Sequence, residues 1–209
     1  SLSIGFAFAA TDADGDQAAD GSASVTVEDD TPVQGTAGTA DPVGEDGLGD
    51  ANPTGGTFDA VDDLSTGTVS LGIDWGADND TRATGDTFGR TVAFSDGAGT
   101  LASAGTVTAA EAGLTISGGS FTSGGVALVY DVTTTDEGGQ VLTAYKGSVG
   151  TGNEVFTIAL DPTATNGSYE FTLVGELDHD DGADSLSIGF AFAATDADGD
   201  QAADGSASV

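Results

Sequence analysis

Residues 1–25 read SLSIGFAFAATDADGDQAADGSASV, and residues 185–209 repeat this stretch letter for letter. Two identical segments of this length do not arise by chance, so the sequence contains an internal repeat whose period, from residue 1 to residue 185, is 184 residues. Such a period suits a globular domain and is far longer than the ~20–50 residues of a solenoid repeat. The sequence therefore predicts one full unit of a tandem array, preceded by the end of another unit.

The repeated stretch predicts a β-hairpin with an acidic loop at its tip. Apolar and small residues alternate from Leu2 to Phe8, which is the period-two pattern of a half-buried strand. The same alternation returns from Ala23 to Val27. The Asp-rich segment lies between these two predicted strands, so we expect it to connect them.

The rest of the chain carries many short apolar segments, and these favour an all-β fold of the β-sandwich type. They occur at residues 69–75, 91–94, 113–117, 126–132, 141–145, 156–160 and 169–177. Residues 126–145 are expected to form a hairpin, and only residues 108–113 look helical, for one or two turns. Residues 26–56 lose the alternation. We therefore expect residues 1–32 to be the end of a preceding repeat plus an inter-repeat junction, and residues 33–209 to be one near-complete repeat.

The charge of the chain excludes several partners. There are 35 acidic and 3 basic residues, giving a net charge of −32, so the chain repels nucleic acids and anionic membranes and attracts cations. Of the acidic residues 28 are Asp, which favours turns and ligates cations; a merely soluble, halophile-like surface is the alternative. The absence of Cys excludes disulfides and thiolate metal sites. No apolar run approaches the ~20 residues that a membrane-spanning helix needs, so no membrane insertion is expected.

The alternating aspartates in the repeated stretch predict a calcium site. Calcium takes ~6–8 oxygen ligands, which alternating side chains and the carbonyl groups between them supply. The spacing is not that of an EF-hand, because the sixth and twelfth positions counted from Asp12 are Gln17 and Ala23. The candidate ligands are Asp12, Asp14, Asp16 and Asp20 in the first copy and Asp196, Asp198, Asp200 and Asp204 in the second. A solvated acidic turn is the alternative interpretation.

Three further acidic clusters are weaker candidates, and for each a solvated loop is an equal alternative. They are Asp178, Asp180, Asp181 and Asp184 before the second copy; Glu28, Asp29 and Asp30 in the expected junction; and Asp74, Asp78 and Asp80. A cation in the junction would fix the angle between two repeats, and Pro32 would stiffen the same place.

The sequence contains no convincing catalytic motif. His179 is the only histidine, and no Gly-x-Ser-x-Gly nucleophile motif accompanies it, so we expect a structural role for it in a turn. Paired carboxylates cannot be used as a signal of glycoside cleavage, because acidic residues occur throughout the chain. We therefore expect no enzymatic activity.

An ordered series of segments resembles a known repeat. The series is VFTIALD at residues 155–161, GSYEFTL at 167–173, LDH at 177–179, SLSIGF at 185–190 and DADGD at 196–200, and VTVEDDTP at 25–32 closes the pattern in the first copy. It resembles the long tandem repeat of giant RTX-type bacterial adhesins that are exported by type I secretion. The glycine-rich RTX nonapeptide itself is missing.

This resemblance implies an immunoglobulin-like, calcium-loaded extender repeat that lies outside the cell, on the bacterial surface. Its partners would be calcium and neighbouring identical repeats of the same chain. Such repeats hold a distal binding domain away from the cell during biofilm formation or attachment. The alternative is a carbohydrate- or ligand-binding adhesion module that uses a surface calcium and an aromatic such as Trp75.

The two identical copies compete for one position in the predicted sheet. The second copy follows residues 169–177 after a short acidic turn, so its loop closure is brief, whereas the first copy would have to reach back across a Pro-rich segment. We therefore expect residues 185–209 to occupy the position, beside residues 169–177. The apolar face of the first copy would then need another partner.

Overall fold

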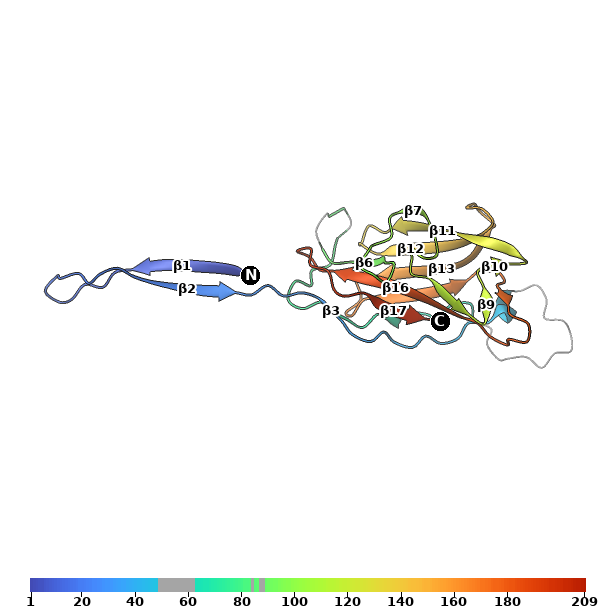
Figure 1. Ribbon diagram of the computed structural model, residues 1–209, viewed down its shortest axis with the longest axis horizontal. Helices are drawn as coiled ribbons and strands as arrows, with labels where there is room; N and C mark the ends of the chain where they lie inside the picture. The colour runs from blue at the N-terminus through green and yellow to red at the C-terminus, as the bar shows by residue number, and fades with distance from the viewer. Residues whose placement is uncertain (49–62, 84, 87–88) are drawn as a thin grey trace. The chain divides into compact units, whose positions relative to one another are not determined.

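The computed structural model describes residues 1–48, 63–83, 85–86 and 89–209, which divide into two compact units, Ser1–Asp30 and Thr31–Val209. The first unit is one antiparallel hairpin of β1 (Leu2–Phe8) and β2 (Gly21–Val27), as the alternation predicted (Figure 1). Leu2 lies opposite Val27 and Phe8 lies opposite Gly21. Both strands are exposed along almost their whole length, so this unit has no core of its own.

The second unit contains a large antiparallel sheet (Figure 1). Its strand order is β10 (Thr122–Ser123), β11 (Val126–Thr134), β12 (Gln140–Lys146), β13 (Glu154–Asp161), β14 (Ser168–Leu173) and β4 (Val69–Ser70), and β7 (Gly105–Val107) also pairs with β11. The β11–β12 hairpin confirms the one predicted at residues 126–145.

A smaller sheet is built around the second copy of the repeated stretch. Its strands are β17 (Gly205–Ser208), β16 (Ser187–Thr195), β6 (Thr91–Phe94) and β8 (Thr115–Ser117). β17 lies along one side of β16, while β6 and β8 follow one another along the other side. Two short pairs complete the described strands: β15 (Asp178–His179) with β9 (Gly119–Ser120), and β3 (Val33–Gln34) with β5 (Ile73–Asp74).

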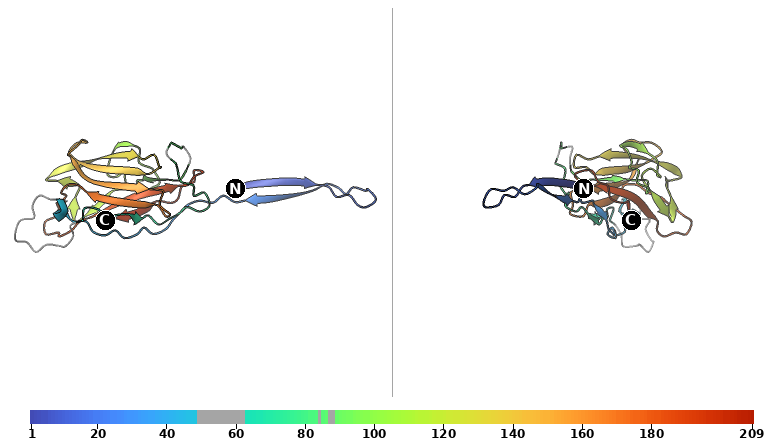
Figure 2. Two further views of the ribbon diagram at one scale, coloured as in Figure 1. Left: turned by 180° about the vertical axis from the view of Figure 1, so that it is seen from behind. Right: turned by 60° about the vertical axis from the view of Figure 1, so that its left-hand side comes forward.

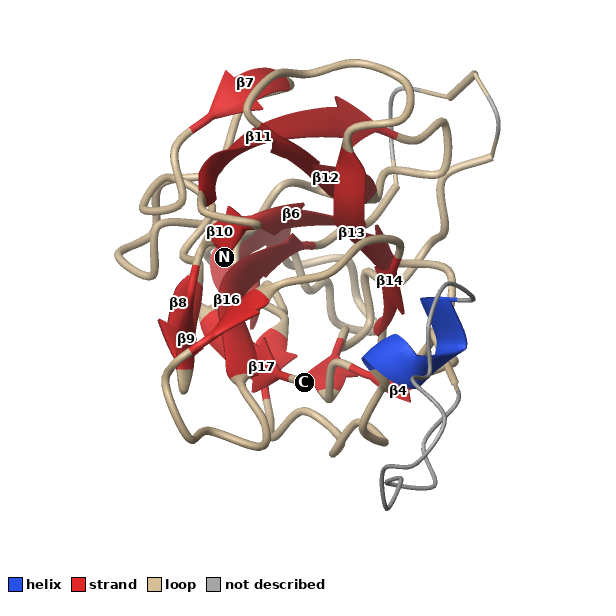
Figure 3. Ribbon diagram, turned by 90° about the vertical axis from the view of Figure 1, so that its right-hand side faces the viewer, coloured by secondary structure: helices blue, strands red, loops and turns tan. Residues whose placement is uncertain are grey.

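The second unit is all-β, and its sheets are layered as in a β-sandwich (Figures 2 and 3). The core lies between the two main sheets. The ring of Phe190 in β16 contacts Tyr169 of β14 edge-on, with 5.1 Å between ring centroids, and Phe94 of β6 at 6.0 Å. Within the large sheet, the rings of Phe156 in β13 and Phe171 in β14 stack with 5.4 Å between their centroids. Burial of these apolar faces is the main stabilising contribution to such a fold.

Residues 185–209, not residues 1–25, form strands of the sandwich, as expected, but they pair with other strands than the expected ones. The expectation placed them beside residues 169–177, and this was wrong: β14 pairs with β13 and β4, whereas β16 pairs with β6, β8 and β17. β14 instead faces β16 across the core, where Tyr169 meets Phe190. Alternation shows which residues share a face, but it does not distinguish pairing at a strand edge from packing face to face.

Three local predictions differ from the structure. The segment at 69–75 is split into β4 and β5 at Gly72, whose φ of +73° favours glycine. The segment at 169–177 ends its strand at Leu173, because the N–H groups of Val174 and Gly175 both donate to the carbonyl of Val155. Residues 108–113 form only a turn, in which the Thr108 N–H donates to Glu111 at 2.7 Å and the Glu111 N–H donates to the Thr108 hydroxyl at 3.2 Å.

Helical structure is confined, in the described part of the chain, to one 3-10 turn at Glu45–Leu48, drawn blue in Figure 3. No helix in these ranges is long and apolar enough to cross a membrane. Part of the predicted irregular segment, residues 49–56, lies outside the described residues.

A buried glutamine connects the two main sheets. Gln140 in β12 accepts a hydrogen bond from the Phe94 N–H of β6 at 2.9 Å and donates one to the Ala102 carbonyl at 3.0 Å. The side chain is only 7% exposed, so these bonds satisfy backbone groups that water cannot reach. Gln140 therefore fixes β6, and with it β16, against the large sheet.

Candidate metal sites

The acidic loop of the first copy is a tight turn closed by Asp12. The N–H of Asp12 donates to the Asp16 carbonyl at 3.0 Å, and Oδ1 of Asp12 accepts from the N–H groups of Gly15 at 3.1 Å and Asp16 at 2.9 Å. Gly15 has a φ of +102°, which a residue with a side chain rarely adopts. One aspartate and one glycine therefore shape this loop.

The second copy of the loop has the same geometry. The N–H of Asp196 donates to the Asp200 carbonyl at 3.0 Å, and Oδ1 of Asp196 accepts from Gly199 at 3.0 Å and Asp200 at 2.8 Å. The φ of Gly199 is +110°. Since the same turn forms on a lone hairpin and inside a β-sandwich, its conformation is set locally by the residues of the loop.

Each loop gathers three carboxylates. Carboxylate oxygens of Asp12, Asp14 and Asp16 lie within 4.8 Å of one another, and those of Asp196, Asp198 and Asp200 do the same. These are the triads that the sequence singled out. Oxygen ligands at this separation suit a hard divalent cation such as calcium.

The carboxylates within each loop perturb one another. A hydrogen bond with Asp196, followed by desolvation and the like charge of Asp196, raises the pKa of Asp198. In the first copy a hydrogen bond from Asp14, together with the backbone N–H of Asp16, lowers the pKa of Asp12. In both loops the neighbouring carboxylates repel one another, and a bound cation would relieve this repulsion.

Burial distinguishes the second loop from the first. Asp12 is exposed, whereas Asp196 is 2% exposed and its Oδ2 is buried without a hydrogen-bond partner. Asp204 likewise keeps Oδ1 buried and unpaired, while its Oδ2 accepts from the Gly99 N–H at 2.6 Å. A buried carboxylate oxygen without a partner is costly, and a cation would satisfy it. The residues of the second loop therefore fit a metal ion better than those of the first.

Asp78 joins the second loop from a distant part of the sequence. Its carbonyl accepts a hydrogen bond from the Ala197 N–H at 3.1 Å, and its carboxylate lies within 4.8 Å of that of Asp198. The sequence had grouped Asp78 with Asp74 and Asp80, but the Asp74 side chain instead accepts from the nearby Gly76 N–H. No local sequence signal links Asp78 to a loop more than a hundred residues further along.

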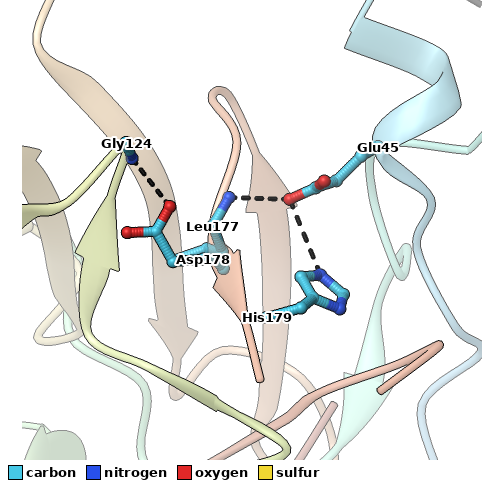
Figure 4. A network of polar contacts seen from close by, with 5 residues as sticks. All are labelled: Glu45, Gly124, Leu177, Asp178 and His179. Atoms are coloured by element: carbon cyan, nitrogen blue, oxygen red, sulfur yellow. Dashed lines mark hydrogen bonds and ion pairs between the residues drawn. The ribbon is translucent and has the colours of Figure 1, made fainter. Parts of the chain in front are cut away.

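The cluster before the second copy is arranged differently from a metal site. Among the described residues, Asp178, Asp180, Asp181 and Asp184 do not bring three carboxylate oxygens within 4.8 Å of one another. Asp178 instead accepts a hydrogen bond from the N–H group of Gly124 at 2.8 Å (Figure 4). It also accepts hydrogen bonds from the Thr122 hydroxyl and from the Gly125 N–H, the latter at 2.7 Å. These donors lower the pKa of Asp178, the Thr122 hydroxyl most. Asp178 thus holds the β10–β11 turn.

Replacing Asp178 with Ala is therefore expected to lower the melting temperature equally in calcium and in chelator. Because the pKa of Asp178 is lowered in the folded state, its stabilising contribution is complete above the ordinary Asp value of 3.8 and is lost as the pH falls through the lowered folded value. Thermal melts of the variant and the parent from pH 2 to pH 7 would measure this. A loss of stability seen only when calcium is present would mean that Asp178 is a metal ligand.

The remaining predicted residues lie in exposed positions or in structural contacts. Glu28, Asp29 and Asp30 follow β2 at the end of the first unit and are exposed, as is Asp20 in the first loop. The only histidine, His179, lies 3.9 Å from Oε1 of Glu45, which also accepts the Leu177 N–H at 2.7 Å (Figure 4). His179 and Glu45 thus connect β15 to the 3-10 turn.

Trp75 is unavailable to a surface ligand. The side chain is 3% exposed, and the guanidinium of Arg90 covers its ring at 4.7 Å from the centroid. Arg90 is itself buried and donates to the carbonyls of Thr163 and Ala164. Trp75 therefore cannot serve as the aromatic platform of a carbohydrate-binding site.

Comparisons with known protein families, with curated proteins and with solved structures give no match for this chain. Its function is therefore inferred from its own residues. Chemically, the second loop can hold a hard cation through oxygen ligands, and it offers that ion one buried, one half-buried and one exposed carboxylate.

Proposed function

We propose that this chain is a calcium-stabilised extender repeat of a large secreted bacterial surface adhesin, which spaces a distal binding domain from the cell. In this proposal the second unit is an immunoglobulin-like β-sandwich. The observation that carries the proposal is the second acidic loop, in which the buried Asp196 presents an unpaired oxygen beside Asp198 and Asp200.

Calcium is the ion that best suits this loop. The loop offers Asp carboxylates and neighbouring carbonyl groups as ligands. Calcium accepts an irregular shell of oxygen ligands, whereas magnesium requires strict octahedral geometry and fits such a site poorly. Extracellular modules bind calcium with dissociation constants of ~10⁻⁴–10⁻³ M, which matches an ion supplied by the surroundings. A cation would also reduce the self-repulsion of a chain with a net charge of −32.

The path of the chain through the second unit supports an extender. The chain enters the sandwich at β3, where Gln34 packs against Gly205 at the beginning of β17, and reaches Val209 past the other end of that strand. From Gln34 to Val209 the chain therefore advances along the length of β17. The loop at residues 196–200 precedes β17, so the candidate metal site lies toward the end where the chain enters.

Small-angle scattering of a two-repeat chain tests the proposal. The chain would consist of residues 1–209 followed by a second copy of residues 26–209, which continues the repeat in its own period. We expect a larger mean radius of gyration and a narrower distribution of molecular sizes in calcium than in chelator. The reason is that a bound ion orders the loop near the connection between consecutive repeats. The same chain carrying Asp196→Asn in both copies is the control and is expected to behave as in chelator. Equal dimensions in calcium and chelator would contradict the extender proposal.

A further inference from the structure

We propose that the N-terminal hairpin is an interaction element whose partner is a second copy of this chain: residues 1–27 dock as the β16–β17 hairpin of the second copy's sandwich. The two hairpins are identical in sequence over 25 residues, yet one is exposed and the other completes a core. The structure thus shows which surface covers the identical apolar face of the second copy. The proposal is independent of calcium binding.

The free hairpin already has the pairing that the docked hairpin adopts. In β1–β2, Phe6 lies opposite Ala23 and Phe8 opposite Gly21; in β16–β17, Phe190 lies opposite Ala207 and Phe192 opposite Gly205. These are the same partners in the two copies, with no shift in register. Because its register is already formed, the free hairpin could dock without rearranging its backbone pairing.

The same glycine contact is also present in both hairpins. The ring of Phe8 lies over Gly21, and that of Phe192 lies over Gly205, so closely that a Cβ atom at either glycine would displace the ring. Aromatic cover of a strand glycine therefore orients the phenylalanine rings before docking. The free hairpin thus presents the side-chain arrangement that the core accepts.

Burial shows what docking would gain. Phe6 and Phe8 are 54% and 53% exposed, whereas their counterparts Phe190 and Phe192 are 2% and 0% exposed. Ile4 changes in the same way, from 52% to the 1% of Ile188. An isolated two-stranded hairpin with such a face is marginally stable in water, so covering it favours association. The acceptor surface includes Tyr169 and Phe94, which contact Phe190 in the second unit.

A docked N-terminal hairpin would have to replace the β16–β17 hairpin that already occupies the position, so the acceptor is a copy whose own hairpin is displaced.

Two full-length variants test this by co-refolding. The acceptor carries Phe6→Asp and Phe190→Asp, so that neither of its own hairpins can enter the core, together with Val92→Cys. The donor carries only Ala10→Cys, because Ala10 corresponds to Ala194, the partner of Val92 in the β16–β6 pairing. The chain contains no other cysteine, so a disulfide between donor and acceptor reports docking in this register.

We expect one disulfide-linked donor per acceptor. We also expect the acceptor to melt cooperatively in this complex, whereas the acceptor alone does not. A donor with an additional Phe6→Asp change is expected to lose at least nine-tenths of the cross-link. The variant Val92→Cys, Ala194→Cys in an otherwise unchanged chain should form the disulfide within one molecule, which shows that the pair can be oxidised even if the acceptor alone does not fold. Three results would each overturn the proposal. The first is that no intermolecular cross-link forms although the control pair is oxidised. The others are equal cross-linking by both donors and capture of the hairpin by an intact copy at another surface.

Discussion

Replacing Phe190 with Ala is expected to lower the free energy of unfolding by about 3–5 kcal/mol, whereas the same change at Phe6 should alter it by less than about 0.5 kcal/mol. The two residues lie in identical sequence surroundings, so they form a matched pair. Phe190 is buried against Tyr169, Phe94 and Phe192, and its truncation leaves a cavity. Phe6 is half exposed, and within the described residues its ring is paired with that of Phe8.

Urea unfolding followed by tryptophan fluorescence would measure this difference. The single tryptophan, Trp75, is buried in the second unit and therefore reports on the core that Phe190 completes. Deletion of residues 185–209 in a chain that also carries Phe6→Asp is the larger version of the same experiment and is expected to abolish the cooperative transition, because neither hairpin can then complete the core, while deletion of residues 1–25 leaves the midpoint nearly unchanged. Equal losses of stability at Phe6 and Phe190 would show that the N-terminal hairpin contributes to the folded core.

Calcium is expected to stabilise the folded chain by about 4 kcal/mol when its free concentration is a thousandfold above the dissociation constant, because the ion binds the native loop and not the unfolded chain. For a domain of this size, a gain of that order corresponds to a rise of roughly 8–16 °C in the melting temperature. Thermal melts in calcium and in chelator, followed by ion counting, would measure the effect. An unchanged melt in chelator, with no ion retained, would exclude a stabilising calcium site.

A matched pair of variants locates the site. Asp196→Asn retains an oxygen that can accept the Gly199 and Asp200 N–H groups but removes the charge, so it should abolish most of the calcium-dependent rise. Asp12→Asn makes the same change in the exposed copy and should leave the rise nearly intact. If Asp12→Asn removed the rise and Asp196→Asn did not, the stabilising ion would have to be assigned to the first loop.

The second loop depends on a part of the chain that no sequence pattern connects to it. The carboxylate of Asp78, a few residues after β5, lies beside that of Asp198, and the Asp78 carbonyl accepts a hydrogen bond from the Ala197 N–H. Asp178 shows the opposite case. Its acidic neighbours suggested a cation ligand, but the fold surrounds it with N–H and hydroxyl donors, which a list of nearby residues does not reveal.

The sequence alone determined the hairpins, their register and the shape of the acidic loop, because alternation, a positive-φ glycine and one accepting aspartate act over a few residues. This is why both copies adopt the same local structure. Only the tertiary structure decided that Phe190 is buried and Phe6 exposed, and that Asp196 is buried with an unpaired oxygen while Asp12 is exposed. Identical residues cannot encode that difference. It arises because β6, β8 and β14, which are distant in sequence, surround one hairpin through pairing and core packing, and burial depends on those contacts.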